Sequence, residues 1–382
     1  MLNSAIDQYL KRIANVLLLN ANFTDNIGLL NGKTGIAIFF FHYARYTGNE
    51  FYKEFADELL DEVFEEIYQN SEINYADGLA GLGTGIEYLV KNSFIKADTN
   101  EVLEEIDLQM HHHADYHLPK SIDLIYGKCG FGKYFAARLN NHTNVEARVA
   151  TINERALERI VNMLNKSYNT YFNLLSVIQF LSDITTLNVN QVKAEAYLNY
   201  AIDKLETMVY EDVHFGTYPG TFNPLSTAVV LIQATEKVGN KEYTERALHF
   251  LKMYETDFRK YLTSDYTNLP SNSLKWSLLY NYLGIKLEDN TYKQLSEDWL
   301  NTAITEGKES LAGFRVMEHS NLPSMGILYG YAGVGLTLLT IIDKCSPDWF
   351  NLIPLQLEIE KTVKIPTQVL NSKSFITELQ NI

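Results

Sequence analysis

Residues 75–90 read YADGLAGLGTGIEYLV, in which a pair of glycines three residues apart opens an apolar run at helical spacing. Variants of this pattern stand at three other places, as GKTGIA from Gly32, GKCGFG from Gly127 and GYAGVG from Gly330. Gly32 precedes Gly78 by 46 residues, and Gly78 precedes Gly127 by 49. The chain therefore contains an internal repeat of nearly constant length, which is the signature of a repeat architecture.

Three weaker copies lie between Gly127 and Gly330. Residues 171–184 keep the apolar helix without the glycines, and residues 215–234 keep Gly216 and Gly220. Residues 273–287 are the most eroded and keep only Gly284. Seven repeat units are therefore predicted, opening near residues 32, 78, 127, 175, 220, 278 and 330.

The segments between these units are typical of amphipathic helices. After Gly48, apolar residues line one side of the predicted helix (Phe55, Leu59, Leu60, Val63, Ile67) and acidic residues line the other (Glu58, Asp61, Glu62, Glu65, Glu66). A helix that is apolar all round requires burial, whereas an amphipathic helix covers a core with one face. The sequence thus predicts an all-α fold, an α/α toroid with an inner and an outer ring, formed as a single domain by residues 1–382.

Net charge, hydropathy and cysteine content restrict the classes of function and the location that the sequence allows. The net charge of −15 argues against a nucleic-acid surface, which needs a basic stripe, and suits a cationic partner or a solvated acidic outer ring. The N-terminal residues have the spacing of an amphipathic helix rather than of a signal peptide, and no apolar run is long enough to cross a bilayer. The two cysteines lie far apart, outside any CxxC motif, so we expect no disulfide framework and a cytoplasmic location.

The paired glycines suggest two roles. Glycine permits positive φ in tight loops and lets backbones approach closely where inner helices converge. It also leaves backbone N–H groups at helix N-termini, which we expect to point into the central mouth of the toroid and to suit an anion or a bound peptide. Packing alone is the other interpretation of each single motif.

Four of these motifs resemble the lanthionine synthetase C-like (LanC-like) family, the cyclases of lantibiotic maturation. They are NGKTGIA, DGLAGLG, IDLIYGKCGFG and GYAGVGLTLL, the last followed by Pro347-Asp348-Trp349. The resemblance runs from about Gly32 to Leu357. It implies a seven-repeat α/α toroid and an activity in which a cysteine thiol of a ribosomally made peptide adds to a dehydroalanine or dehydrobutyrine.

The family's chemistry, as the resemblance implies it, uses zinc held by two cysteines and a histidine, together with an aspartate and a second histidine that handle protons. The aspartate falls on Asp123, four residues before Gly127. Asp77, Gly78, Gly127 and Gly330 stand in the loops expected at the mouth and are the candidate substrate-binding residues. Cys129 is a further candidate at the site, although a free cysteine is more often a small buried residue.

The remaining family positions depart from the pattern. The fourth unit has residues around Leu175, Ser176 and Val177 in place of the histidine motif. The fifth has Thr217, Tyr218 and Pro219, and the sixth has Leu274, Lys275, Trp276 and Ser277, where the family has zinc ligands. No cysteine stands between Cys129 and Cys345. We therefore expect a divergent member with no zinc at the family's position.

The histidines offer one substitute metal site. His111, His112, His113 and His117 form a dense cluster, and His113 and His117 are spaced to share a helix face. A solvated surface is the plainer interpretation of such a run. His42, His214 and His319 stand alone in the sequence and are expected to be structural.

Two functions from different classes remain. The first is a zinc-less peptide-binding or complex-forming module that works on a ribosomally synthesised precursor peptide, beside a dehydratase or other modifying enzyme. The second is a divergent cyclase that relies on proximity, with Asp123 and Cys129 at its site. A distant third is a sugar-active α/α barrel enzyme, for which Asp77 and Asp123 are the only candidate carboxylate pair.

Overall fold

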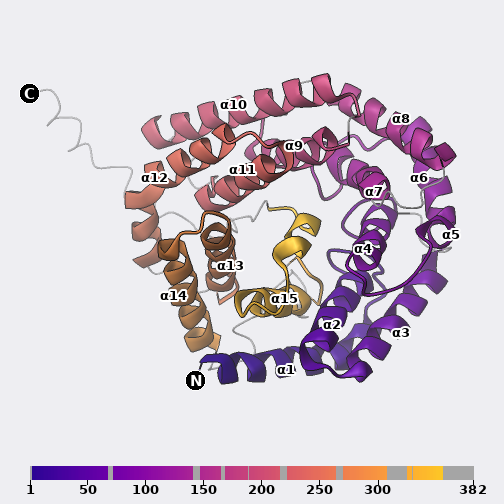
Figure 1. Ribbon diagram of the computed structural model, residues 1–382, viewed down its shortest axis with the longest axis horizontal. Helices are drawn as coiled ribbons and strands as arrows, with labels where there is room; N and C mark the ends of the chain where they lie inside the picture. Colours follow the sequence, from indigo (N-terminus) through magenta and orange to yellow (C-terminus); the bar gives the residue numbers. More distant parts are fainter. Residues whose placement is uncertain are drawn as a thin grey trace, which may run out of the picture.

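The computed structural model describes residues 2–67, 72–140, 147–164, 168–187, 189–215, 222–263, 270–307, 325–328 and 330–355. Within these residues the secondary structure is helical, without a strand. The helices form two concentric rings, as the sequence predicts (Figure 1). The described inner helices are α2 (Lys33–Thr47), α4 (Leu79–Lys91), α7 (Lys128–Asn140), α9 (Tyr171–Thr185), α11 (Pro224–Val238), α13 (Pro270–Lys286) and α15 (Tyr331–Ile341).

The outer ring surrounds them. Its described helices are α1 (Leu2–Asn20), α3 (Glu50–Glu66), α5 (Thr99–Val102), α6 (Glu104–Tyr116), α8 (Ala147–Met163), α10 (Gln191–Phe215), α12 (Glu242–Thr263) and α14 (Asn290–Gly307). Most inner helices begin close to the expected repeat openings, but α13 begins at Pro270, earlier than the opening expected near residue 278. Gly220, expected to open the fifth unit, lies outside the described residues.

The two rings differ in burial for the reason that their sequences suggest. Lys33 to Ala44 of α2 are all buried, whereas in α3 the buried side chains recur at helical spacing on one face (Ala56, Leu59, Leu60, Val63). Gly48 ends α2 at φ +65°, a left-handed conformation that glycine adopts at no steric cost. Asn49 then caps α3, its side chain accepting the Phe51 N–H at 3.1 Å.

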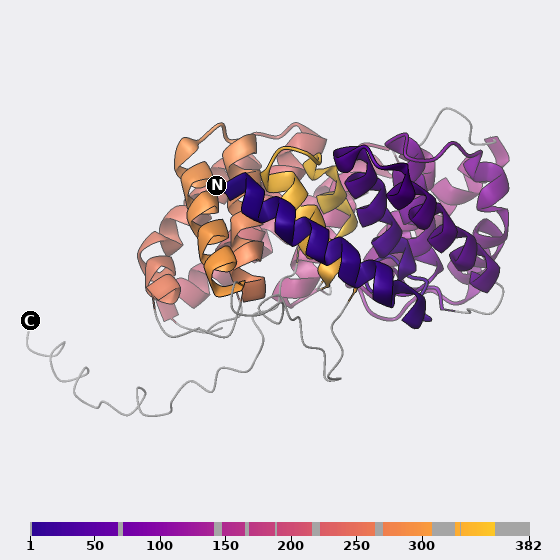
Figure 2. The same cartoon turned by 90° about the horizontal axis from the view of Figure 1, so that it is seen from below.

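The N-terminal helix closes the ring. Helix α1 occupies the outer position beside α15, so the first helix completes the last unit, and Figure 2 shows it crossing the side of the molecule obliquely. Its apolar stripe is fully buried (Ile6, Leu10, Ile13, Leu17), and the Tyr9 hydroxyl donates to the Ile304 carbonyl of α14 at 3.3 Å. The amphipathic pattern of this segment therefore serves ring closure.

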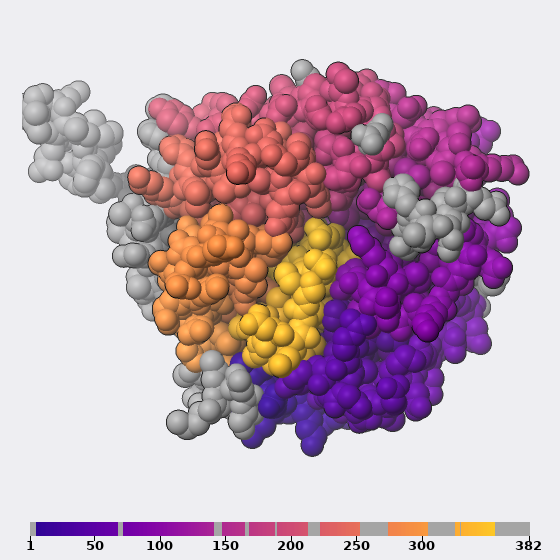
Figure 3. All heavy atoms as spheres, viewed as in Figure 1, coloured from indigo at the N-terminus to yellow at the C-terminus, as the bar shows by residue number. Residues whose placement is uncertain are grey.

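A short C-terminal segment lies inside the ring. After α15 the chain forms the 3₁₀ helix η4 (Pro347–Leu352), and the space-filling view shows this part of the chain in the middle of the molecule (Figure 3). The Trp349 indole is buried and donates to the Thr340 hydroxyl at 2.9 Å. Among the described helices, none has the length and apolar character that crossing a membrane requires.

Candidate functional site

Four loops that lead to the first glycine of each pair precede α2, α4, α7 and α15 and meet at one end of the inner ring. We call residues 26–31, 72–77, 121–126 and 325–328 the loop collar. Gly32, Gly78 and Gly330 are the N-caps of α2, α4 and α15, with φ of −119°, −119° and −118° and extended ψ. No side chain caps these three helices, so the repeat in the sequence is also a repeat in backbone conformation.

The loops themselves satisfy the first N–H groups of these helices. Lys33 N–H donates to the Asn26 carbonyl at 2.8 Å, and Leu79 N–H donates to the Glu72 carbonyl at 3.1 Å. The same bond, seven residues back, joins Lys128 to Ser121 at 3.0 Å, and in the last unit the second helical N–H, that of Ala332, donates to the Met325 carbonyl at 3.2 Å. The expectation that helix N-terminal donors point unoccupied into the mouth is therefore wrong for these groups.

The second glycine of each pair lets the first turn of its helix lie close to the backbone of the preceding loop. A Cβ on Gly81 would lie 1.9 Å from the Tyr75 carbonyl oxygen, and one on Gly130 would lie 2.0 Å from that of Leu124. Gly35 and Gly333 have the same relation to carbonyls six residues upstream. Among the described glycines, positive φ occurs at Gly48 and Gly239 and at no glycine of a pair, so the expected role in positive-φ turns is also wrong.

Backbone hydrogen bonds run from loop to loop around the collar. Leu328 N–H donates to the Leu30 carbonyl at 3.1 Å, Leu30 N–H to Ala76 at 2.9 Å, and Ala76 N–H to Ile125 at 3.2 Å. The four residues occupy equivalent places in their repeats. The first of these bonds joins the last unit to the first, so the collar contributes to closure of the ring.

Asp77 lies at the collar and ties three loops together. Its Oδ1 accepts hydrogen bonds from the side-chain amides of Asn26 at 2.8 Å and Asn31 at 2.9 Å, and the Tyr126 hydroxyl lies 3.5 Å from Oδ2. Gly78 follows directly as the N-cap of α4. These partners give Asp77 an evident structural role.

Asp123 is half-buried, and its side chain accepts hydrogen bonds from the backbone of its own loop. Its Oδ1 accepts the N–H groups of Ile125 at 2.9 Å and Tyr126 at 2.7 Å. Asn74, at the equivalent place in the second unit, accepts the Asp77 N–H at 2.8 Å in the same way. A Cβ on Gly127 would lie 2.5 Å from the Asp123 nitrogen, so this glycine allows the loop to fold back on itself.

Cys129 lies on α7 with no exposed surface. Burial raises the pKa of its thiol well above the usual value, the charge of Asp123 raises it further, and Lys128 and Lys133 oppose the shift. The protonated thiol is therefore the favoured form, whereas a nucleophile or a metal ligand has to be a thiolate.

The positions that resemble the family's zinc site carry other chemistry. On α13, Ser277 turns to α14 and donates to the Ser296 carbonyl at 2.8 Å, and the Trp276 ring packs 6.4 Å from that of Trp299. Lys275 borders a small apolar cavity of about 50 Å³ that Gly330 and Trp349 also line. The fifth-unit residues Thr217, Tyr218 and Pro219 lie outside the described residues.

In the fourth unit, α9 carries Leu175, Ser176 and Val177 in its buried first half. The Ser176 hydroxyl accepts the Leu124 N–H at 3.2 Å, which joins α9 to the collar loop of the third unit.

The histidine cluster lies on the outer ring at the end of α6. His111 Nε2 is 2.7 Å from the Asn153 side-chain oxygen, and His113 Nδ1 is 3.0 Å from the Gln109 carbonyl. Among the described residues, no set of three or more His, Cys, Asp or Glu side chains is arranged to hold a metal ion. The side chain of His214 and the whole of His319 lie outside the described part.

His42, which is isolated in the sequence, belongs in the structure to a group of three polar side chains with Tyr88 and Cys345. Its Nδ1 is 3.2 Å from the Cys345 sulfur, and its Nε2 is 2.8 Å from the Tyr88 hydroxyl. Burial, and then the charge of Arg45, lower the pKa of His42 to about 3, and burial raises the pKa of Cys345 to about 12. Both groups are neutral at pH 7, as in a packed interior contact.

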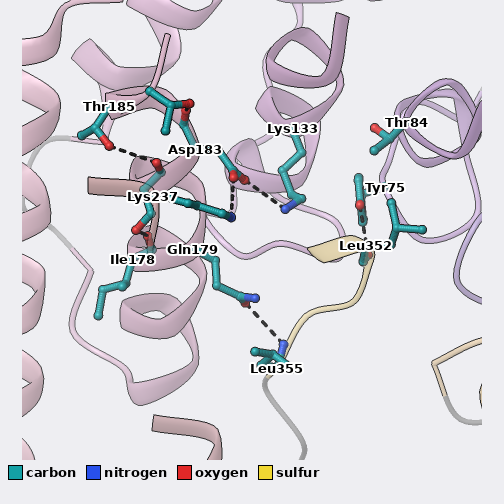
Figure 4. Close-up of polar contacts among 12 residues, drawn as sticks. Tyr75, Thr84, Lys133, Ile178, Gln179, Asp183, Thr185, Lys237, Leu352 and Leu355 are labelled. Atoms are coloured by element: carbon teal, nitrogen blue, oxygen red, sulfur yellow. Dashed lines mark hydrogen bonds and ion pairs between the residues drawn. The ribbon is translucent and has the colours of Figure 1, made fainter. Parts of the chain in front are cut away.

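Side chains inside the ring also bind the backbone of the segment that follows η4, a contact that the sequence did not reveal. The Tyr75 hydroxyl donates to the Leu352 carbonyl at 3.0 Å, and the Leu355 N–H donates to the Gln179 side-chain oxygen at 3.3 Å (Figure 4). Tyr75 comes from the collar loop before α4, and Gln179 comes from α9. Two inner-wall side chains thus bind a peptide backbone through its C=O and N–H groups.

Comparison with known proteins agrees with this architecture. The family model described as "Lanthionine synthetase C-like protein" matches residues 24–201, which include the first three loops of the collar. This part of the chain is similar to the LanC-like family. A solved structure of nisin cyclase is similar over 93% of this chain and 96% of that chain, with a TM-score of 0.55 and 14% sequence identity. That likeness shows the fold alone, and a search of curated proteins finds no match.

Proposed function

We propose that this LanC-like chain is a peptide-holding module of lanthipeptide-type maturation, which binds a ribosomally made precursor inside the ring or serves a dehydratase beside it. The observation that carries the proposal is the backbone binding of residues 352–355 by Tyr75 and Gln179. Contacts to C=O and N–H groups are independent of side-chain identity. The same kind of contact suits a precursor whose side chains change during modification.

The donor set supports a role without zinc. A zinc-dependent cyclase needs thiolate and imidazole ligands, whereas Lys275, Trp276 and Ser277 offer an ammonium, an indole and a hydroxyl that is already bonded to Ser296. Cys129 is a buried thiol with a raised pKa. These residues do not fit the zinc site of the family.

The carboxylates support the same proposal. Asp77 accepts hydrogen bonds from two asparagines of the collar, and Asp123 accepts two backbone N–H groups of its own loop. Both carboxylates therefore already have structural roles. As a catalytic group of a cyclase or of a sugar-active enzyme, either one would have to give up these hydrogen bonds. A LanC-like fold over nearly the whole chain keeps the divergent cyclase as the second candidate.

One experiment separates the two. The purified full-length chain is mixed with a synthetic peptide, N-acetyl-dehydroalanyl-Ala-Ala-Cys amide carrying a fluorophore, with and without added Zn²⁺. Anisotropy measures binding, and reaction of the remaining thiol with a maleimide measures ring closure. We expect saturable binding and a rate of thiol loss equal to that without protein.

Acceleration of thiol loss would establish the cyclase instead, and absence of both binding and acceleration would refute the module. Gln179→Leu is the variant for the proposed contact, since it removes the amide and keeps a similar volume. Gln294→Leu is its matched control, because Gln294 lies on the outer helix α14 and bonds only locally, to Asp298 at 3.1 Å.

A further inference from the structure

A larger cavity lies at the opposite end of the ring from the loop collar, where the inner helices end. It encloses about 320 Å³ and is lined by the second halves of α4, α7, α9 and α11 together with η4. Exposed residues form its rim (Lys91, Asn140, Thr186, Asp348), so solvent reaches it. No residue of the collar takes part in this cavity.

Three charged side chains from three inner helices meet at its wall. Asp183 of α9 lies between Lys133 of α7 and Lys237 of α11, with N–O distances of 3.1 and 2.5 Å (Figure 4). The side chain of Lys133 is only 8% exposed, that of Asp183 16% and that of Lys237 20%. We call these residues the cavity triad.

The cavity triad carries one more positive charge than negative. Burial lowers the pKa of Lys133, and Asp183 opposes that shift. Burial alone would raise the pKa of Asp183, but the two lysines outweigh it and lower this pKa to about 2. One carboxylate is thus shared by two ammonium groups, each of which has three N–H donors.

Two other acids line the cavity: Asp348 lies at its exposed rim, and Glu87 has a buried partner of its own. Glu87 accepts a hydrogen bond at 2.6 Å from Arg138, a side chain with no exposed surface. It therefore does not serve as the second counter-ion of the lysines. A buried positive charge in a chain of net charge −15 is not part of a general basic surface. Burying such a charge is costly unless an anion offsets it.

We propose that the cavity triad binds a carboxylate, from a small acid or from a peptide C-terminus, in the space that Lys133 and Lys237 border. The carboxylate supplies the missing negative charge, and the ammonium groups donate to it in charge-assisted hydrogen bonds. The open rim admits the rest of the ligand. This inference is separate from the proposed peptide module, since it uses neither Tyr75 nor Gln179, and only Leu352 is common to that contact and the cavity wall.

The test measures binding by calorimetry on the full chain at constant ionic strength. The probes are acetate, N-acetyl-triglycine and N-acetyl-triglycine amide. We expect acetate and the free-acid peptide to bind and the amide to fail. Tighter binding of the peptide acid than of acetate assigns the source as a peptide C-terminus, and equal binding assigns it as a small acid.

Two variants change the charge of the cavity triad in opposite directions. Lys237→Met should weaken binding about tenfold, the effect of one charge-assisted hydrogen bond. Asp183→Asn should strengthen it and make the Tm rise with added acetate, because the two lysines then lack their counter-ion. Lys286→Met is the control, since Lys286 makes a comparable ion pair with Glu236 at 2.5 Å outside this cavity.

The proposal is overturned if acetate and the amide bind alike, if neither acid binds, or if Lys286→Met has the effect of Lys237→Met. Loss of folding in Asp183→Asn that acetate does not reverse also counts against it. Lys237→Met leaves the Lys133–Asp183 pair in place, so its binding can be measured in a folded protein.

Discussion

The inner helices of this ring begin in two different ways. Those of the glycine units, α2, α4 and α15, have a glycine N-cap and no capping side chain, and their first N–H groups bond to carbonyls of the preceding loop. In the fourth and fifth units a side chain caps the helix: Thr170 accepts the Asn173 N–H at 3.2 Å, and Asn223 accepts the Ser226 N–H at 3.0 Å.

The difference explains how units without glycine pairs keep their place in the fold. Both arrangements satisfy the donors that a helix N-terminus leaves unpaired. The glycine loop does so with backbone carbonyls and joins the next loop, while a capping side chain acts locally. Loss of the paired glycines therefore removes a link of the collar but leaves an inner helix that can still form.

The largest effect should come from placing a methyl group in a glycine loop. Gly81→Ala puts a Cβ 1.9 Å from the Tyr75 carbonyl oxygen, so the loop or the helix must shift. We expect a loss of about 3 kcal/mol in the free energy of unfolding, measured by urea denaturation. Asn173→Ala is the matched control at the equivalent position of α9, and it should cost less than about 0.5 kcal/mol. Equal losses of stability in Gly81→Ala and Asn173→Ala would mean that the glycine units and the side-chain-capped units do not differ in packing at this position.

The next effect concerns the cavity triad, which joins a glycine unit to the two capped units. Because the pKa of Asp183 is lower in the folded chain than in the unfolded chain, its carboxylate stabilises the fold above about pH 4. This contribution is lost as the pH falls through the folded-state value of about 2. We expect wild type to exceed Asp183→Asn by about 2 kcal/mol at pH 6 and the gap to close near pH 2. A gap that stays constant with pH would show that ionisation of Asp183 does not stabilise the fold.

A smaller effect should follow removal of the capping side chains. Thr170→Ala and Asn223→Ala should each lower the free energy of unfolding by about 1 kcal/mol, the usual cost of losing an N-cap. Gly78→Ser sharpens the comparison, because it supplies a capping residue where the loop has no space for a Cβ, 2.6 Å from the Glu72 carbonyl oxygen. Thermal unfolding should show that this serine destabilises; a gain in Tm would refute the distinction.

The smallest effect on stability is expected at Asp123. Asp123→Asn keeps the oxygen that accepts two N–H groups, as Asn74 does in the second unit, so stability should change by less than about 0.5 kcal/mol. Asp123→Ala removes the acceptor and should cost about 1 kcal/mol. Peptide anisotropy on Asp123→Asn then isolates the charge: unchanged binding fits a cap, whereas weaker binding at unchanged stability would assign Asp123 to recognition.

The sequence carried enough information for the architecture. The spacing of Gly32, Gly78 and Gly127 led to the ring, and the stripe that begins at Ile6 marked an amphipathic helix, because both follow from local periodicity. The physical role of the glycines was harder to infer. Close approach to a carbonyl six residues back depends on the loop path, which a glycine pair alone does not specify.

The polar groups inside the ring were mostly missed. His42 and Cys345 are 303 residues apart and meet only because the last unit closes on the first. A signal existed for the cavity triad: Lys133 and Asp183 are 50 residues apart and Asp183 and Lys237 are 54, close to the repeat length, and all three interrupt apolar helices. Charges that recur at the repeat interval on inner helices indicate side chains that meet across neighbouring units.

Closure of the ring by α1 has a consequence for synthesis of the chain. The Tyr9 hydroxyl finds its acceptor on a residue 295 positions later. At about 5 to 20 residues per second, the buried stripe of α1 leaves the ribosome about 15 to 60 s before its partner helices are made. During that interval the apolar stripe of α1 lacks its partner helices, so we expect chaperones to bind the nascent chain until the last unit emerges.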